Sequence, residues 1–192
     1  MIENGANINL FKPIDTIKAR KELNQNQNNN YICFVGSLSP HQGIQYLIKC
    51  APLILKKNPT ARFMIVGYGN MKHELKNLAE QIGVSEKFIF TGAVPYEKVP
   101  LYINACDVCV APFVKARNER CGLSPLKMCE YLACEKPVVT TDINDSGMKE
   151  LLEETNAGIL VEPENPQELA EAIIKLLKDK KLREEMGRRG RE

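Results

Sequence analysis

Short apolar runs alternate with segments of helical spacing along most of the chain, and this alternation constrains the fold more than any other feature. The runs are apolar on both faces, which is typical of strands that helices cover on both sides. They cover residues 31–36, 62–67, 87–92, 107–111, 136–141 and 158–161. Repeated strand–helix units predict an α/β fold, a doubly wound parallel sheet of about six strands.

The segments between these runs predict helices over 42–56, 70–82, 96–105 and 148–153, a further helix beginning at Ser124, and a last one capped by Asn165. Asn165, Pro166 and Glu168 nearly form a capping box, which marks the start of that helix. Residues 24–30 are all Asn or Gln and predict a mobile polar linker. We therefore divide the chain into a lead-in with its linker, residues 1–30, and one domain, residues 31–192.

The net charge of +2 does not favour a nucleic-acid partner. Six of the seven cysteines lie in apolar runs, and Cys121 lies in a polar loop. This distribution, with no apolar run long enough to span a bilayer, predicts a reduced, cytoplasmic location. Cys106 and Cys109 have the spacing of a redox pair, but they fall in an expected strand, so buried thiols are the favoured interpretation. We expect no metal site.

The stretch from Ser124 to Glu130 predicts an anion-binding helix start. Ser124 suits the N-cap and Pro125 the first helical position, which places Lys127 in the first turn. A lysine there opposes the helix dipole, so it favours an anionic ligand such as a phosphate. The alternative is that Lys127 and Glu130 form an ordinary surface pair.

Glycines follow several of the expected strands, where parallel sheets bind their ligands. Gly36 and Gly43 bracket the first turn, and Gly67 and Gly69 follow the second strand. A Gly-x-Gly-x-x-Gly motif does not follow the first strand, and no Gly-Lys-Ser/Thr occurs. These absences disfavour a dinucleotide oxidoreductase and a P-loop enzyme.

The ordered set of motifs resembles the C-terminal, nucleotide-sugar-binding domain of the group 1 glycosyltransferases of GT-B architecture, a Rossmann-like half of the GT-B fold. The matching segments are Glu3–Pro13, Val35–Gly43, Ile65–Gly69, Ile89–Val94, Ala133–Val139 and Gly158–Pro163. The first of these resembles the family's interdomain lead-in. The resemblance covers nearly the whole chain.

The family's signature is a pair of glutamates separated by seven residues. The resemblance implies that Glu130, the second of them, accepts hydrogen bonds from the donor ribose. The first falls on Gly122, so the usual carboxylate contact to the donor sugar is missing. Glu119 lies three residues early and is the alternative, and Leu123 belongs to the same sugar-binding loop.

The phosphate ligands also depart from the family pattern. Many relatives have an arginine and a lysine where this chain has Ser37 and Gln42. Lys127 is the expected replacement, with Arg117 or Arg120 as helpers, although both arginines also fit as solvated loop charges. Backbone N–H groups supply the other diphosphate donors at Gly36, Ser37 and Ser124. By resemblance, Val94 contacts the nucleobase.

The resemblance implies retaining transfer of a sugar from a nucleotide diphosphate sugar, with neither cofactor nor metal. No Asp-x-Asp metal motif is present. The expected partners are the nucleotide sugar and an N-terminal acceptor-binding domain of the same protein, through which alone we expect any peripheral membrane contact. The isolated domain is expected to bind the donor without transferring sugar. Two alternatives remain: half of a nucleotide-sugar epimerase, and a non-enzymatic nucleotide-sugar sensor.

Overall fold

The computed structural model of the chain describes residues 5–115, 126–142 and 147–192. Within these residues six strands form one sheet, in the order β3-β2-β1-β4-β5-β6, and all paired strands are parallel. The strands are β1 (Asn30–Val35), β2 (Ala61–Val66), β3 (Phe88–Gly92), β4 (Val108–Ala111), β5 (Val138–Thr141) and β6 (Gly158–Val161). The predicted α/β fold with a doubly wound parallel sheet is confirmed.

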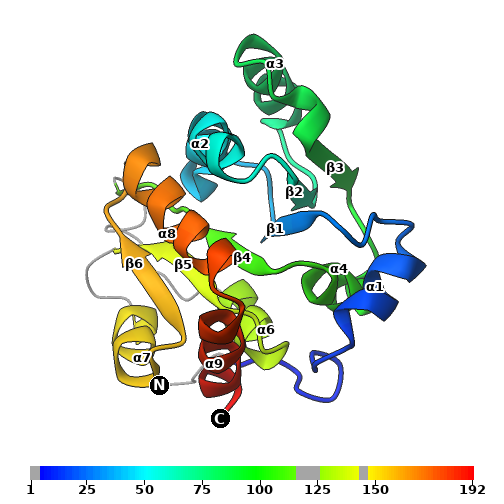
Figure 1. The fold of residues 1–192 in the computed structure, drawn as a ribbon, viewed down its shortest axis with the longest axis vertical. Helices are drawn as coiled ribbons and strands as arrows, with labels where there is room; N and C mark the ends of the chain where they lie inside the picture. The colour runs from blue at the N-terminus through cyan, green and yellow to red at the C-terminus, as the bar shows by residue number, and fades with distance from the viewer. Residues whose placement is uncertain (1–4, 116–125, 143–146) are drawn as a thin grey trace.

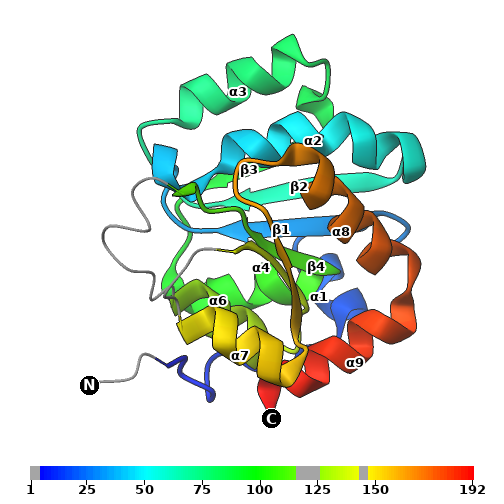
Figure 2. The same cartoon turned by 90° about the vertical axis from the view of Figure 1, so that its left-hand side faces the viewer.

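Helices cover both faces of this sheet (Figure 1), and Figure 2 shows the two layers on either side of the strands. One layer contains α2 (Ile44–Lys57), α3 (Lys72–Gln81) and α8 (Pro166–Lys178). The other contains α1 (Thr16–Glu22), α4 (Val99–Ala105), α6 (Leu126–Ala133), α7 (Gly147–Thr155) and α9 (Lys180–Arg191). In the described part of the chain, three short 3₁₀ helices connect strands and helices: η1 (Pro40–Gln42), η2 (Ser85–Lys87) and η3 (Tyr96–Lys98).

Strand β1 shows why the apolar runs have no alternating pattern. Ile32 and Phe34 belong to the buried cluster beneath α2 and α8. Tyr31 and Cys33 belong to the second cluster, which includes residues of α4 and α6. Because both faces of the strand are buried, both sets of alternate residues are apolar.

The described part of the lead-in packs against the sheet domain. Asp15 caps α1 by accepting a hydrogen bond from the Lys18 N–H at 2.8 Å, and α1 packs on α4. Arg20 forms a buried ion pair with Asp107 at 2.7 Å. Phe11 is fully buried in the cluster that contains α6. The division between residues 30 and 31 stays a prediction, but these contacts join both sides of it.

The cysteines that the structure describes are mostly part of the core. Five of them are buried: Cys33, Cys50, Cys106, Cys109 and Cys134. Their burial supports the interpretation as small hydrophobic residues over that of a redox pair. Among the described residues, no group of histidine, cysteine and acidic side chains is arranged to hold a metal ion. None of the helices in these residues is long and apolar enough to cross a membrane.

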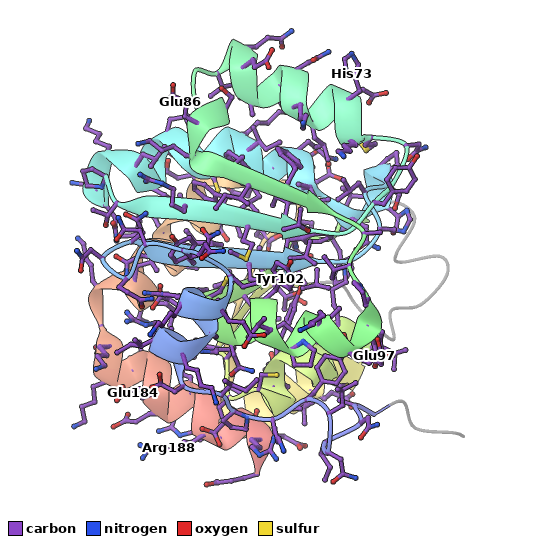
Figure 3. The ribbon with its side chains drawn as sticks, turned by 90° about the vertical axis from the view of Figure 1, so that its right-hand side faces the viewer. His73, Glu86, Glu97, Tyr102, Glu184 and Arg188 are labelled. Carbon is purple, nitrogen blue, oxygen red and sulfur yellow. The ribbon has the colours of Figure 1, made fainter. Side chains whose placement is uncertain are left out.

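The strand order reverses between β1 and β4, and ligands of doubly wound sheets bind at the carboxyl ends of the strands beside such a point. The helices mark the two faces in Figure 3, where His73 on α3 lies on the opposite side of the sheet from Glu184 and Arg188 on α9. Both η1, after β1, and α6, after β4, begin at the carboxyl edge beside the reversal.

Candidate functional site

The carboxyl ends of β1, β2 and β3 are in close backbone contact. The Gly36 N–H donates to the Val66 carbonyl at 2.9 Å, and the Gly67 N–H donates to the Gly92 carbonyl at 3.0 Å. A Cβ on Gly67 would lie 1.9 Å from the Gly36 carbonyl oxygen. Only glycine allows this approach, because any larger residue would push the two strand ends apart.

The segments that flank the strand reversal are also linked by backbone. The Val114 N–H, after β4, donates to the His41 carbonyl in η1 at 3.2 Å. Gly43 has a φ of +71°, and a Cβ there would lie 1.6 Å from the Pro112 carbonyl oxygen. The turn after β1 is therefore fixed against the end of β4. The sequence predicted that the next helix begins at residue 42; in the structure residue 42 ends η1, and α2 begins at Ile44.

Lys127 extends from the first turn of α6 to the end of β1. A Cβ on Gly36 would lie 2.6 Å from the Lys127 Nζ, so the ammonium group lies directly over this glycine. Nζ also lies 4.1 Å from the centre of the Phe34 ring and donates a hydrogen bond to Oε1 of Gln42. The structure thus brings together Lys127, Gly36 and Gln42 from three different segments.

Burial lowers the pKa of Lys127 to about 7, and the nearby Glu130 carboxylate opposes this shift. The contacts with Phe34 and Gln42 are weaker stabilisers of a cation than a full negative charge is. The ammonium charge is therefore incompletely compensated, and an anion beside Nζ would stabilise it.

Glu130 lies one turn further along α6 and is 8% exposed. Its Oε1 accepts a hydrogen bond from the Tyr96 hydroxyl at 2.9 Å. Burial raises the pKa of Glu130, while the hydrogen bond from Tyr96 and the charge of Lys127 oppose the rise. Since Glu130 is buried and Lys127 is half-buried, they are not the solvated surface pair that was the alternative.

Two of the other predicted site residues lie on the same carboxyl edge. Ser37 is exposed, and its Oγ lies 3.2 Å from the Ser39 Oγ. Val94 is half-buried after β3 and packs against the cluster that contains α6. Six predicted residues lie outside the described residues: Arg117, Glu119, Arg120, Gly122, Leu123 and Ser124.

One predicted donor needs correction. We expected the Gly36 N–H to bind phosphate, but it donates to the Val66 carbonyl as part of the β1–β2 pairing. The β1–β2 hydrogen bonding here continues to the residue after β1, and the sequence pattern does not show how far such pairing continues. Gly36 contributes its close backbone approach instead.

Sequence reasoning missed two contacts of this site. It treated Gln42 as a lost lysine, whereas Gln42 accepts a hydrogen bond from Lys127. It assigned no role to Tyr96, whose hydroxyl binds Glu130 from η3. Tyr96 lies just beyond β3, at the edge of the sheet where such folds bind ligands, and this position could have indicated a role in the site.

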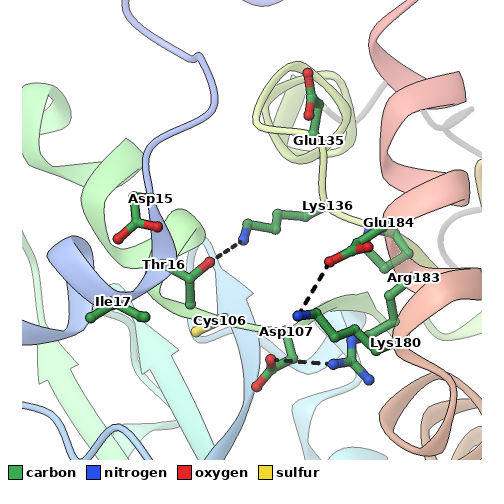
Figure 4. A pocket seen from close by; sticks show the side chains of 11 residues that line it. Asp15, Thr16, Ile17, Cys106, Asp107, Glu135, Lys136, Lys180, Arg183 and Glu184 are labelled. Carbon is green, nitrogen blue, oxygen red and sulfur yellow. Dashed lines mark hydrogen bonds and ion pairs between the residues drawn. The ribbon is translucent and has the colours of Figure 1, made fainter.

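A cavity of about 350 Å³ lies at the opposite edge of the sheet, near the amino ends of β4 and β5 (Figure 4). Several of the charged groups around it are paired within the protein. Arg183 lies 3.8 Å from Asp107, and Lys180 lies 3.7 Å from Glu184. Lys136 donates to the Thr16 hydroxyl at 3.2 Å, which joins the segment before β5 to α1. This cavity is best explained as part of the packing between α1, α9 and the sheet.

The doubly wound sheet, with Lys127 and Glu130 at its carboxyl edge, defines an α/β domain of the Rossmann-like class. The chain belongs to the glycosyl transferases group 1 family, which it matches over residues 15–192. This match confirms the resemblance to the group 1 glycosyltransferases of GT-B architecture.

The chain is 30% identical over 179 residues to alpha-D-kanosaminyltransferase of Streptomyces kanamyceticus, which covers 92% of this chain and 44% of that protein. The structure of the present chain is similar to that of sucrose-phosphate synthase from Thermosynechococcus elongatus, with a TM-score of 0.85 and 25% identity. The match covers 98% of this chain and 45% of the synthase. The structure is also similar to HepE of Anabaena in complex with UDP and glucose, with a TM-score of 0.78, 27% identity and coverage of 98% and 50%. The chain spans about half the length of these relatives.

Proposed function

We propose that this chain is the donor-binding half of a retaining glycosyltransferase, which moves a sugar from a nucleoside diphosphate sugar to an acceptor. The observation that carries the proposal is the Lys127 ammonium group over Gly36, beside the point where the strand order reverses. HepE, which shares the fold at 27% identity, was solved with UDP and glucose, and this supports a nucleotide sugar as the ligand class.

In this proposal Lys127 binds the diphosphate. The leaving diphosphate gains negative charge in the transition state, and a fixed cation in a half-buried position stabilises it more strongly than water does. The Ser37 N–H and the start of α6 are the proposed backbone donors, and Gly36 lets the phosphates approach the strand end. Arg117 and Ser124 remain proposed helpers.

Glu130 is the proposed ligand of the ribose. A carboxylate accepts hydrogen bonds from both hydroxyls of a diol, and this one lies one helical turn from the proposed phosphate ligand. Val94 is proposed to contact the nucleobase, and the segment with Glu119, Gly122 and Leu123 to contact the sugar. We propose no metal or other cofactor, since the donor's charge is met by the protein's own cations.

The acceptor is proposed to bind to another domain of the same protein, because the matched relatives are about twice as long as this chain. The isolated chain then binds the donor without transferring sugar. Measurable glycosyl transfer by these 192 residues alone would contradict that part of the proposal.

Calorimetric titration of the chain with UDP, GDP and ADP tests the proposed ligand class. We expect one of the three to bind, and Lys127→Ala to weaken it by about tenfold to a hundredfold, as expected for the loss of a charge-assisted hydrogen bond. The variant's affinity for the corresponding nucleoside, which has no phosphate, should not change.

Lys56→Ala is the matched control, because Lys56 is exposed in the last turn of α2, far from the start of that helix. It should bind the diphosphate like the wild type. Unchanged affinity in Lys127→Ala would refute the phosphate role.

A further inference from the structure

Tyr96 connects two parts of the carboxyl edge that are separate in sequence. It lies in η3, just after β3, and its hydroxyl donates a hydrogen bond of 2.9 Å to Oε1 of Glu130 on α6. Its side chain is 52% exposed, whereas Glu130 is 8% exposed. A half-exposed tyrosine thus directs its polar end toward a buried carboxylate.

The ring of Tyr96 is itself held in place. It packs against Phe11, with ring centroids 5.3 Å apart and planes inclined at 58°, a geometry that aromatic pairs favour. Phe11 is fully buried, so it gives the tyrosine a rigid support. The chain of contacts runs from Phe11 through Tyr96 to Glu130, entirely within described residues.

We propose that Tyr96 is a positioning residue for the nucleotide ribose: its hydroxyl holds one oxygen of Glu130, so that the other oxygen faces the ribose diol. This inference rests on the proposed function, in which Glu130 binds the ribose. The physical reason is that a glutamate side chain has several rotamers, and a ligand must otherwise restrict them when it binds.

The hydrogen bond has a second effect on the same carboxylate. Burial raises the pKa of Glu130, and the bond from Tyr96 opposes this rise. Tyr96 therefore keeps Glu130 ionised to lower pH, and an ionised carboxylate is the stronger acceptor for hydroxyl groups. Removing the hydroxyl should move the acid limb of nucleotide binding to higher pH.

A competing role for the Tyr96 hydroxyl, in which it blocks the ribose site, predicts a change in nucleotide affinity of the opposite sign. If the Tyr96 hydroxyl occupied the place of a ribose hydroxyl in the absence of ligand, its removal would strengthen nucleotide binding. The positioning role predicts weaker binding, and only for ligands that have the ribose hydroxyls.

A cycle of two proteins and two ligands provides the test. Wild type and Tyr96→Phe are titrated with whichever of UDP, GDP and ADP binds, and with its 2′,3′-dideoxy counterpart. We expect Tyr96→Phe to weaken binding of the ribonucleotide by about threefold to tenfold and to leave the dideoxynucleotide within about twofold. Phenylalanine keeps the ring against Phe11, so folding should be preserved, and a thermal melt checks it.

Tyr102→Phe is the matched control, since it removes a hydroxyl from a half-buried tyrosine of the neighbouring helix α4 (Figure 3). Equal effects of Tyr96→Phe on both ligands, no effect on either, or tighter binding would each overturn the inference while the proposed function stands. Wild-type protein that does not distinguish the ribonucleotide from its dideoxy form would overturn the inference together with the ribose role of Glu130. Wild-type protein that binds no nucleoside diphosphate would overturn the proposed function itself, and the inference with it.

Discussion

At the scale of residues, Lys127 combines a position that suits an anion with a charge that its surroundings only partly stabilise. Its Nζ lies over Gly36 and the Phe34 ring, and its pKa is lowered by burial to about 7. In the proposed complex, a diphosphate would place negative charge beside Nζ and so raise this pKa again. Binding and protonation of Lys127 are therefore linked.

This linkage predicts proton uptake when the nucleotide binds at pH 8. There Lys127 is largely neutral in the free protein, from its pKa of about 7, whereas we expect it to be charged in the complex. Calorimetry in buffers of different ionisation enthalpy measures the number of protons, and we expect uptake approaching one. At pH 6 Lys127 is already charged, so its contribution should become small.

Lys127→Met should abolish the uptake at pH 8, because methionine preserves the apolar stem without the amine. The phosphate does not disturb this measurement, since its second pKa of about 6 leaves it ionised at pH 8. Proton release at pH 8, or the same uptake in Lys127→Met, would refute the assignment.

At the scale of elements, the sequence pattern predicted all six strands within one or two residues. The largest shift is in β5, expected to begin at residue 136 and observed from Val138, because Pro137 has no N–H for the ladder. The expected helix over 96–105 divides into η3 and α4, with Pro100 in the first turn of α4. Local rules thus fix the type of each element better than its ends.

The sequence correctly predicted Asn165 as the N-cap of α8. Asn165 accepts hydrogen bonds from the Gln167 and Glu168 N–H groups at 3.1 and 3.2 Å. We expect Asn165→Ala to lower the free energy of unfolding by about 1 kcal/mol, since it leaves these donors unpaired at the helix end. Urea unfolding monitored by circular dichroism measures the change.

Gln167→Ala is the control for this cap, because Gln167 is exposed and its side-chain amide donates to another surface side chain, Glu171. Its effect should stay within about 0.5 kcal/mol. Equal effects of the two substitutions would show that the cap contributes nothing specific.

At the scale of the whole molecule, the fold and the placement of Lys127 and Glu130 on one helix were predictable from the sequence. The long-range contacts of the candidate site were not. Glu130 and Lys127 share a helix, so their spacing is local information. The bonds from Lys127 to Gln42 and from Arg20 to Asp107 join residues 85 and 87 positions apart. No periodicity encodes such pairs, because they depend on which elements the sheet order places together.

Asp107 ties the lead-in to the centre of the sheet and supports a prediction for global stability. Its Oδ2 accepts from Arg20 at 2.7 Å and from the Tyr31 N–H at 2.7 Å. Asp107→Ala leaves the buried Arg20 guanidinium group without its counter-charge, so we expect a loss of about 3–5 kcal/mol in denaturant unfolding. Asp107→Asn keeps an acceptor and should lose less. A loss below about 1 kcal/mol for Asp107→Ala would contradict this role.

The contact between Gly36 and Lys127 has a consequence for how the chain tolerates sequence change. A side chain at residue 36 would occupy the space of the ammonium group, and the φ of +144° there disfavours one in any case. Residues 36 and 127 are therefore coupled: the Lys127 ammonium group on α6 can lie at the end of β1 only if residue 36 has no side chain. Variation at either position is interpretable only together with the other, so a mutational library of this edge should randomise both residues in the same molecules.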